Sequence, residues 1–595
     1  MAALRLFLRL VPTESQRVFA LTLISGALCG LAAVAFHLSI LYAEHLLIDR
    51  AMSAPGRSRI WWTVLTPLLG GLAGGALLQY FVPGARGSGI PQVKVAYAIK
   101  GGRVPFGDAA GKFLIGSLQI GSGASLGREG PTVQICAGVA SLLGRVMALS
   151  RVNLKRLVPV GSAAGIAAAF NAPIAAVTFT IEEVVGDLDQ TVLSGVVIAA
   201  ALAAAIERGI LGEHPVFSIS QTYGLRHAES LLTYAALGIA AAFVSILFTD
   251  SLLILRRWFQ RLMIIPAWAR PGAGGLATGA LAAVALVWLK IGGVTGGGYE
   301  TLSQALAGGL AVRVMLVLCA FKLAATIFSY SSGGAGGIFA PALFIGGMLG
   351  GSIGRLDALL FNHPGEGTGA FALVGMGAVF AGIIRAPITS VLIIFEMTGS
   401  YGLILPLMIA NMTAYGLARR LRPTPVYEAL LEQDGIHLPH RRGPVTHALE
   451  QLRVSSAMTQ NPVTLLSQAT VAQALESIAP YDYSTYPVTD AQGCYLGMIS
   501  EARLRRTMAA GNGQQRIGQL LEPREHVFPD DSLVRAAVRI NRSGERQLAV
   551  LAPHDRQQLI GLLTITDIVR AQALAAQEVD DSHRTSSPDI SGRGQ

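Results

Sequence analysis

The segment GSAAGIAAAFNAPIAAVTFTIEEV, residues Gly161–Val184, recurs in the second half of the chain as GMGAVFAGIIRAPITSVLIIFEMT, residues Gly375–Thr398. The two segments align without a gap, and Glu182 of the first falls on Glu396 of the second. A match of this length inside one chain indicates an internal repeat. The repeat therefore predicts two related, largely apolar halves, at about 18–210 and 231–431, with the functional site where they meet.

The composition is that of a membrane protein. Of the 595 residues, 52% are hydrophobic and 14% are charged, whereas soluble domains carry about 25% charged residues. A disordered chain and a charge-covered soluble globule are therefore excluded. The 69 glycines follow no period of three, which excludes collagen, and they suit close helix packing in a bilayer. The net charge of +10 favours cytoplasmic loops and membrane lipid headgroups over nucleic acid, which we do not expect as a partner.

Apolar density divides the chain into domains. The expected domains are an N-terminal cytosolic segment at 1–17, a transmembrane domain at 18–435, a polar linker at 436–451, a soluble α/β region at 452–573 and a disordered tail at 574–595. The four cysteines have no short spacing, so neither a disulfide framework nor a metal site is expected.

The apolar runs of the membrane region differ in length. Long runs predict helices that cross the bilayer, and they lie at Val18–Leu47, Ile60–Phe81, Leu231–Leu255 and Gly274–Leu289. Shorter runs broken by Gly or Pro predict helices too short to span, which are tolerated only inside protein or along a cavity. These lie at Gly87–Ala98, Pro131–Leu143, Ala172–Val184, Gly337–Gly350 and Ala386–Met397.

Three glycine-rich turns lead into such short runs. They are GSGIP at Gly87–Pro91, GREGP at Gly127–Pro131 and GGIFAP at Gly336–Pro341. Proline in the first helical turn after glycine is typical of a helix start. A helix start presents free N–H groups and about half a positive charge, so several starts directed at one point would bind an anion without a fixed cation. Plain close packing of membrane helices is the alternative for any single turn.

These three motifs, in this order, resemble the signature sequences of the CLC family of chloride channels and chloride/proton antiporters. The segments AAFNAPIA, IIRAPIT and FEMTGSY resemble the repeat helices of the same family, and the likeness covers about Val18 to Leu431. The resemblance implies an all-α polytopic membrane protein, an inverted repeat of short tilted helices, and a homodimer with a separate pathway in each subunit.

The resemblance also implies site residues for chloride. Ser88 would give its hydroxyl to the anion, Ile338 and Phe339 their backbone N–H groups, and Tyr427 its phenol. Residues expected in the pore region are Gly87, Gly89, Lys112, Arg128, Gly130 and Gly337. Without the resemblance, Tyr427 would be interpreted as an interfacial tyrosine.

Two carboxylates are expected to do the proton chemistry. Glu129 lies in an apolar stretch, where an ionisable residue is costly and functional by default. It matches the external gating glutamate of the family, which blocks the path when ionised and swings away when protonated, and a structural salt bridge is the alternative. Glu183 matches the family's internal proton acceptor, and a water-facing carboxylate at a helix end is the alternative. Glu182 has a repeat partner and is expected to be structural.

The soluble region contains a second repeat. VSSAMTQNPVTLLSQATVAQALESI, from Val454, resembles IGQLLEPREHVFPDDSLVRAAVRI, from Ile517. The pair looks like tandem CBS domains, at about 452–508 and 517–573, which often bind adenine nucleotides. Thr564 and Asp567 match the ribose-binding pattern, whereas the first copy has Arg503 at the equivalent place. At most one nucleotide site is therefore expected, and a scaffold that only dimerises is the alternative.

The sequence thus predicts a membrane transporter rather than an enzyme, in a bacterial inner membrane and with both termini cytosolic. The expected activity is exchange of chloride for protons, with no required cofactor and an adenine nucleotide at the CBS pair. A passive chloride channel with the same path is the first alternative. A membrane-bound enzyme or receptor is the second, but no zinc motif, nucleophile elbow or P-loop supports it.

Overall fold

The computed structural model of the chain describes residues 13–186, 190–212, 223–224, 229–360, 367–399, 401–438, 452–481, 483–521, 525–543, 546–555, 557–571 and 573–574. The chain divides into two compact units, Met1–Pro439 and His440–Gln595. The expected tail, apart from residue 574, and most of the expected linker lie outside the described residues.

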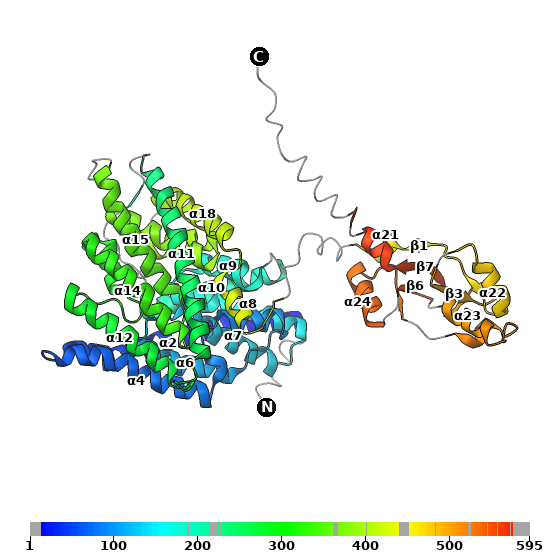
Figure 1. Cartoon of the computed structure of the whole chain (residues 1–595), viewed down its shortest axis with the longest axis horizontal. Coiled ribbons are helices and arrows are strands. Elements are labelled where there is room, and N and C mark those ends of the chain that lie inside the picture. The colour runs from blue at the N-terminus through cyan, green and yellow to red at the C-terminus, as the bar shows by residue number, and fades with distance from the viewer. Residues whose placement is uncertain are drawn as a thin grey trace, which may run out of the picture. The chain divides into compact units, whose positions relative to one another are not determined.

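The first unit is helical throughout its described part (Figure 1). Its elements are α2 (Glu14–Glu44), η1 (His45–Asp49), α3 (Arg50–Ser53), α4 (Ser58–Tyr80), η2 (Pro83–Ala85), α5 (Ile90–Ala98), α6 (Phe106–Gly121), α7 (Glu129–Val146), α8 (Arg151–Phe170), α9 (Pro173–Phe179), η3 (Thr180–Val185), α10 (Gln190–Leu211), α11 (Ser230–Arg261), α12 (Arg270–Leu289), α13 (Tyr299–Leu306), α14 (Val312–Ser331), α15 (Phe339–Leu360), α16 (Thr368–Ile384), α17 (Pro387–Thr398), η4 (Tyr401–Leu403), α18 (Ile404–Leu421) and α19 (Val426–Gln433).

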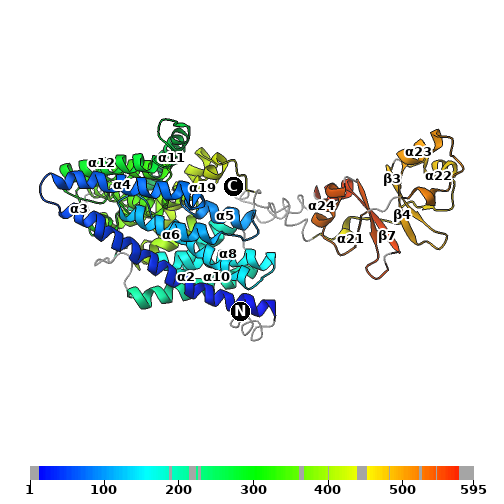
Figure 2. The same cartoon turned by 90° about the horizontal axis from the view of Figure 1, so that it is seen from below.

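The expected long spans are confirmed. Among the described residues, eight helices are long and apolar enough to cross a membrane, and four of them contain the predicted long runs apart from Phe81, which follows α4. The first of these helices begins at Glu14, four residues before the predicted run, because Thr13 and Gln16 form a reciprocal capping box. In Figure 2 this helix, α2, lies beside α8 and α10, against which it packs.

One expectation about length is wrong. The run Gly337–Gly350 was expected to be too short to span, but α15 continues to Leu360 and is long enough. Its glycines extend the packing instead of ending the helix. A Cβ atom on Gly350 would lie 2.0 Å from the Phe371 carbonyl oxygen of α16, so glycine is what allows the two backbones to approach.

The repeat appears in the structure as a reciprocal pair of helix caps. The Glu182 carboxylate accepts hydrogen bonds of 3.2 and 2.9 Å from the N–H groups of Ile388 and Thr389, at the start of α17. The Glu396 carboxylate accepts bonds of 3.0 and 2.7 Å from the first N–H groups of α9. Each half thus satisfies the free donors of a helix start in the other half, which accounts for the recurrence of this carboxylate.

The second unit contains two strand-and-helix modules. Its elements are α21 (Val454–Ala457), β1 (Thr459–Gln460), β2 (Leu465–Leu466), α22 (Val471–Ile478), β3 (Thr485–Thr489), β4 (Tyr495–Ser500), α23 (Glu501–Ala509), η5 (Ile517–Leu520), β5 (His526–Val527), α24 (Leu533–Ser543), β6 (Gln547–Leu551) and β7 (Leu559–Thr564). The strands form sheets of order β2-β3-β4 and β1-β7-β6-β5.

The leading segment of each module crosses to the other module. Strand β1 of the first module pairs antiparallel with β7 of the second (Figure 1), and Val454 lies in the second module's core. Conversely, Ile517 lies in the first module's core. The two modules therefore depend on each other for their cores and for covering a sheet edge.

Candidate functional site

Three helices of the membrane unit begin at one place. The backbones of Gly127 and Gly337 exchange hydrogen bonds of 2.7 and 2.8 Å, which join the turn before α7 to the turn before α15. A Cβ atom on Gly89 would lie 2.7 Å from the Gly130 carbonyl oxygen, and one on Gly130 would lie 2.5 Å from the Ser88 carbonyl oxygen. Glycine also suits the φ of +100° at Gly89. The starts of α5, α7 and α15 therefore converge, together with their free N–H groups.

Two hydroxyl groups lie at this convergence. Ser88 is fully buried, and its Oγ accepts a 3.3 Å hydrogen bond from the Ile90 N–H group at the start of α5. Tyr427, on α19, is also fully buried, and its phenol interacts with Ser88. No described residue gives the Tyr427 hydroxyl a hydrogen bond of good geometry. Because an unmet buried hydroxyl is costly, this place suits an anion that would accept from it.

Lys112 fixes the turn that carries Ser88. Its side chain, fully buried on α6, donates a 2.6 Å hydrogen bond from Nζ to the Gly87 carbonyl oxygen. Gly87 has a φ of +76°, and its N–H group donates to the Gly334 carbonyl oxygen at 3.0 Å. The lysine thus holds the turn that carries Ser88, the residue expected to bind the anion.

Glu129 is the first residue of α7, and its side chain is completely buried. Its Oε1 accepts a hydrogen bond from the Tyr299 hydroxyl, and its Oε2 accepts one of 3.4 Å from the Ala340 N–H group in the first turn of α15. The carboxylate therefore lies at the helix start where Ile338 and Phe339 were expected to hold the anion.

Arg128 lies beside Glu129 without an ion pair to it. Its guanidinium donates to the Ala169 carbonyl oxygen at 3.3 Å and stacks over the Tyr299 ring, 5.6 Å from the centroid. Within the described part of the chain, Glu129 takes part in no salt bridge. The described residues therefore do not support the alternative in which Glu129 forms a structural salt bridge.

Glu183 lies in a buried cluster of charges. Its side chain is 3% exposed and its Oε1 is 2.6 Å from Nζ of Lys94, on α5. The same Nζ is 3.5 Å from Oε1 of Glu428, a residue of α19 whose side chain is 35% exposed. The alternative of a water-facing carboxylate is wrong for Glu183, because burial with a lysine partner takes it out of solvent. The cluster joins two helices of the candidate anion site, since α5 begins beside Ser88 and α19 carries Tyr427.

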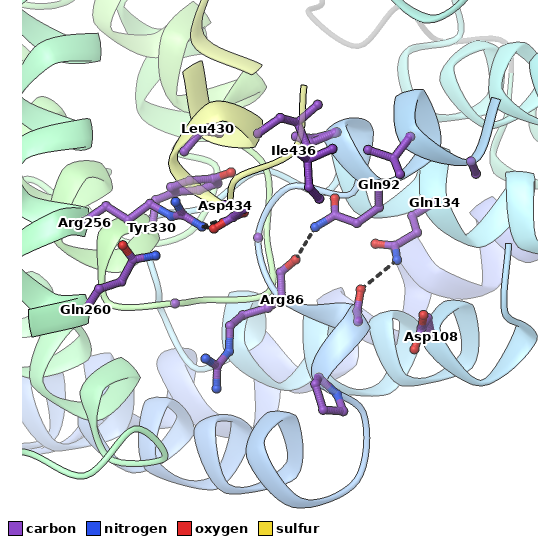
Figure 3. A pocket seen from close by; sticks show the side chains of 18 of the residues that line it. Arg86, Gln92, Asp108, Gln134, Arg256, Gln260, Tyr330, Leu430, Asp434 and Ile436 are labelled. Carbon is purple, nitrogen blue, oxygen red and sulfur yellow. Dashed lines mark hydrogen bonds and ion pairs between the residues drawn. The ribbon is translucent and has the colours of Figure 1, made fainter. Parts of the chain in front are cut away.

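A cavity of about 380 Å³ opens beside the candidate anion site. Figure 3 shows Arg86, Gln92, Gln134 and Tyr330 around it, and the Tyr330 phenol interacts with the Ser88 backbone. The basic residues of its lining are Arg86, Lys100, Arg103, Arg256 and Arg270, against the acidic Asp108 and Asp434. Asp434 is already paired with Arg256 at 2.7 Å. The excess of cations makes this cavity attractive to anions.

Sequence reasoning missed Tyr299, Lys94 and Arg86. Lys94 carried a usable signal, because a lysine in a short apolar helix is an ionisable residue at membrane depth. Tyr299 follows the glycine run Gly296–Gly298, another glycine-rich helix start. Its partner Glu129 is 170 positions away, a distance that no local pattern bridges.

The expected nucleotide residues form a helix cap in the second unit. Asp567 Oδ2 accepts hydrogen bonds of 2.9 and 2.8 Å from the Thr564 N–H and hydroxyl groups, and Thr564 Oγ1 accepts one of 3.1 Å from the Asp567 N–H group. This is a capping box. Among the described residues Asp567 Oδ1 makes no hydrogen bond, so it suits a ribose hydroxyl donor.

Comparison with known proteins gives the family. The profile of the family described as "Voltage gated chloride channel" matches residues 70–419, and the CBS domain profile matches 454–510 and 519–574. An H(+)/Cl(-) exchange transporter ClcA of Salmonella arizonae is 32% identical over 441 residues, which is 72% of this chain and 91% of the relative.

Solved structures agree in fold. The chain resembles a slow cyanobacterial Cl−/H+ antiporter with a TM-score of 0.64 and 27% identity, over 70% of this chain and 98% of the other. It resembles a eukaryotic CLC transporter with a TM-score of 0.60 and 19% identity, over 93% and 98% of the two chains, which bears on the fold alone. The chain therefore belongs to the voltage-gated chloride channel (CLC) family of integral membrane transport proteins, not to a family of enzymes, and it carries two CBS domains.

Proposed function

We propose that this protein exchanges chloride for protons across a membrane. The observation that carries the proposal is the position of Glu129, whose carboxylate accepts a hydrogen bond from the first turn of α15, where an anion is expected to bind. An ionised carboxylate and a chloride ion compete for the same N–H groups because both are anions. Protonation removes the negative charge of Glu129 and releases the N–H groups of α15 to chloride. Binding of chloride at this site is therefore coupled to binding of a proton by Glu129.

The anion path begins at the basic cavity. Arg86 lines it one residue before Gly87, and Tyr330 connects it to the Ser88 backbone. Chloride would pass from there to the hydroxyls of Ser88 and Tyr427, and then to the α15 start that Glu129 vacates. Helix starts and hydroxyls offer partial charges only, which bind an anion weakly enough to release it.

The proton path begins at the charge cluster around Lys94, in the middle of α5. Glu428 is partly exposed and shares the Lys94 ammonium with the buried Glu183. We assign Glu428 as the solvent-side contact and Glu183 as the buried acceptor, with Lys94 compensating the charge. A buried acid without that lysine would be far costlier to ionise.

A passive channel with the same anion path is the rival, and reversal potentials separate the two. In a bilayer with equal chloride and unequal pH on the two sides, an exchanger shows a reversal potential set by the pH gradient, whereas a channel reverses at zero. Glu183→Gln and Glu428→Gln should reduce the pH-driven shift while chloride current persists. The matched control is Glu432→Gln. Glu432 is an exposed glutamate on α19, the helix that carries Glu428, and its substitution should leave the shift unchanged. A wild-type reversal at zero would favour the channel.

Membership of the CLC family and the presence of two CBS domains support further proposals about assembly, location and nucleotide binding. We propose a homodimer with one pathway per subunit, in a bacterial inner membrane and with both termini cytosolic. We also propose that the CBS pair binds one adenine nucleotide at Thr564 and Asp567. Size-exclusion chromatography with light scattering tests the dimer, and calorimetry of the full-length protein with ATP, ADP and AMP tests the nucleotide site. If calorimetry shows no heat of binding at millimolar nucleotide, the nucleotide proposal fails and the CBS pair is interpreted as a scaffold only.

A further inference from the structure

Tyr299 touches the gating carboxylate from the other half of the membrane unit. Its hydroxyl donates to Glu129 Oε1, and its ring lies under the Arg128 guanidinium at 5.6 Å. Tyr299 is the first residue of α13, a short helix from which no other described residue donates a hydrogen bond to the carboxylate. One carboxylate oxygen of Glu129 is therefore bound by the start of α15 and the other by the Tyr299 hydroxyl.

The loop before Tyr299 is held rigidly by a buried lysine. Lys322 of α14 is completely buried. Its three N–H donors are shared among four carbonyl oxygens, those of Gly293, Val294, Thr295 and Gly296, at distances from Nζ of 3.1, 3.1, 3.3 and 2.6 Å.

Glycine permits the path of this loop. Gly296 and Gly298 have φ values of +54° and +76°, and a Cβ atom on Gly298 would lie 2.7 Å from the Phe344 ring. The Lys322 ammonium lies over the same ring, 5.1 Å from its centroid. These contacts hold the backbone that leads into α13, and Tyr299 at the start of that helix reaches the Glu129 carboxylate with its hydroxyl.

We propose that Tyr299 is a latch for the gate, and that Lys322 is a positioning residue acting through the loop at Gly293–Gly298. The tyrosine hydroxyl donates to the ionised carboxylate and so stabilises the closed state, because a hydrogen bond to the charged form favours that form. The inference rests on the gating role proposed for Glu129. It adds a residue that sets the pH at which the gate opens.

Other groups also face the carboxylate and share in its electrostatics. From the described elements packed around it these are Arg128 at the N-cap of α7, which acts on Tyr299 together with Glu129, and the Tyr427 phenol of α19, on which Glu129 acts. Arg128 in turn interacts with Glu207 of α10. Tyr299 differs from them because it alone donates a side-chain hydrogen bond to Glu129 within the described structure.

The test is the pH dependence of chloride efflux from liposomes that contain the full-length protein. Tyr299→Phe keeps the ring under Arg128 and removes only the hydroxyl. Its loss should move the pH of half-maximal efflux upward by roughly one to two units, because the closed, ionised gate loses a hydrogen bond. Lys322→Met should shift the midpoint in the same direction by less, and Lys322→Arg should restore part of the wild-type value.

Two controls keep the outcome specific. Tyr234→Phe, which removes the hydroxyl of a buried tyrosine stacked on Phe371 at 4.1 Å, should not move the midpoint. Adding Tyr299→Phe to Glu129→Gln should also change nothing in the pH profile, since the gate no longer titrates. An unshifted midpoint in a folded Tyr299→Phe protein overturns the latch, as does an equal shift from Tyr234→Phe.

Failure of the latch is distinguishable from failure of the exchange proposal. If the wild type moves chloride without protons, exchange fails, yet the efflux midpoint of Tyr299→Phe still decides the latch. If the wild type couples protons and the midpoint does not move, the latch alone fails. A lysine with a purely structural role would lower the amount of folded protein without moving the midpoint, so an unmoved Lys322→Met midpoint overturns the positioning role.

Discussion

Lys112 in the first half and Lys322 in the second each donate a 2.6 Å hydrogen bond to the carbonyl oxygen of a glycine in the turn before a short helix. The segments Lys112–Pro131 and Lys322–Pro341 align without a gap, and Gly123 and Gly333 have the same φ of +102°. The two halves therefore share a backbone plan in which a buried lysine secures a glycine turn.

The chemistry placed on that plan differs between the halves. Glu129 of the first half aligns with Phe339 of the second, and the carboxylate accepts from the helix start next to that phenylalanine. In the proposed mechanism the first half supplies the carboxylate of Glu129 and the hydroxyl of Ser88, whereas the second supplies the N–H donors of α15 and Tyr299. The repeat therefore builds the same backbone scaffold twice, and the two halves differ in the side chains that the scaffold carries at the candidate site.

The largest expected effect comes from removing the asymmetric carboxylate. Glu129→Gln should abolish proton movement and make chloride flux independent of pH, because an amide cannot carry a proton and resembles the neutral gate. Paired chloride and proton flux assays in liposomes measure both. Glu396→Gln, a carboxylate of the second half, should retain proton coupling. Loss of all chloride flux in a folded Glu129→Gln protein would show that this glutamate has another role.

The symmetric carboxylates should act on stability instead. Glu182→Gln and Glu396→Gln should each lower the free energy of unfolding by about 1–3 kcal/mol, since each loses charge-assisted hydrogen bonds to a helix start. The loss should be greater for Glu182, which also accepts a 2.6 Å hydrogen bond from the Thr389 hydroxyl. Unfolding in detergent measures both variants. If only one of them is destabilised, the caps are not equivalent.

The equivalent glycines of the repeat should show a smaller difference. A Cβ atom at Gly375 would lie 2.2 Å from the Gly346 carbonyl oxygen, and one at Gly161 would lie 2.6 Å from the Cys136 carbonyl oxygen. Gly375→Ala and Gly161→Ala should therefore both destabilise by about 1–3 kcal/mol, with Gly375→Ala the worse. Thermal unfolding of the purified variants tests this. Equal stability with wild type would mean that the helices separate easily.

The CBS pair should give the smallest effect on transport. Asp567→Ala should weaken nucleotide binding roughly ten- to a hundredfold and leave anion selectivity unchanged, because no residue of the membrane unit is altered. Arg503→Ala, at the matching place of the first module, should leave binding unchanged. Calorimetry compares them. Equal loss in both variants would place the nucleotide elsewhere.

The glycine and proline signals predicted much of the fold and of the site. The sequence predicts three features: the three helix starts, the equivalence of Glu182 and Glu396, and the CBS pair. Each of them rests on a local pattern or on an internal repeat. The extent of α15 was not, since Gly350 looked like an interruption and is instead a contact with α16. The partners of Glu129 and Glu183 could not be predicted either, because tertiary packing brings Tyr299 to Glu129 and Lys94 to Glu183.

The most direct test of coupled exchange is uphill proton movement in liposomes that contain only this protein. An outward chloride gradient is imposed at equal pH on the two sides, and the external pH is followed. Coupled exchange predicts that chloride efflux drives protons inward, so that the external solution becomes alkaline, and that Glu129→Gln abolishes this proton movement while chloride still leaves. Chloride efflux from the wild type without any proton uptake would contradict it and indicate a channel.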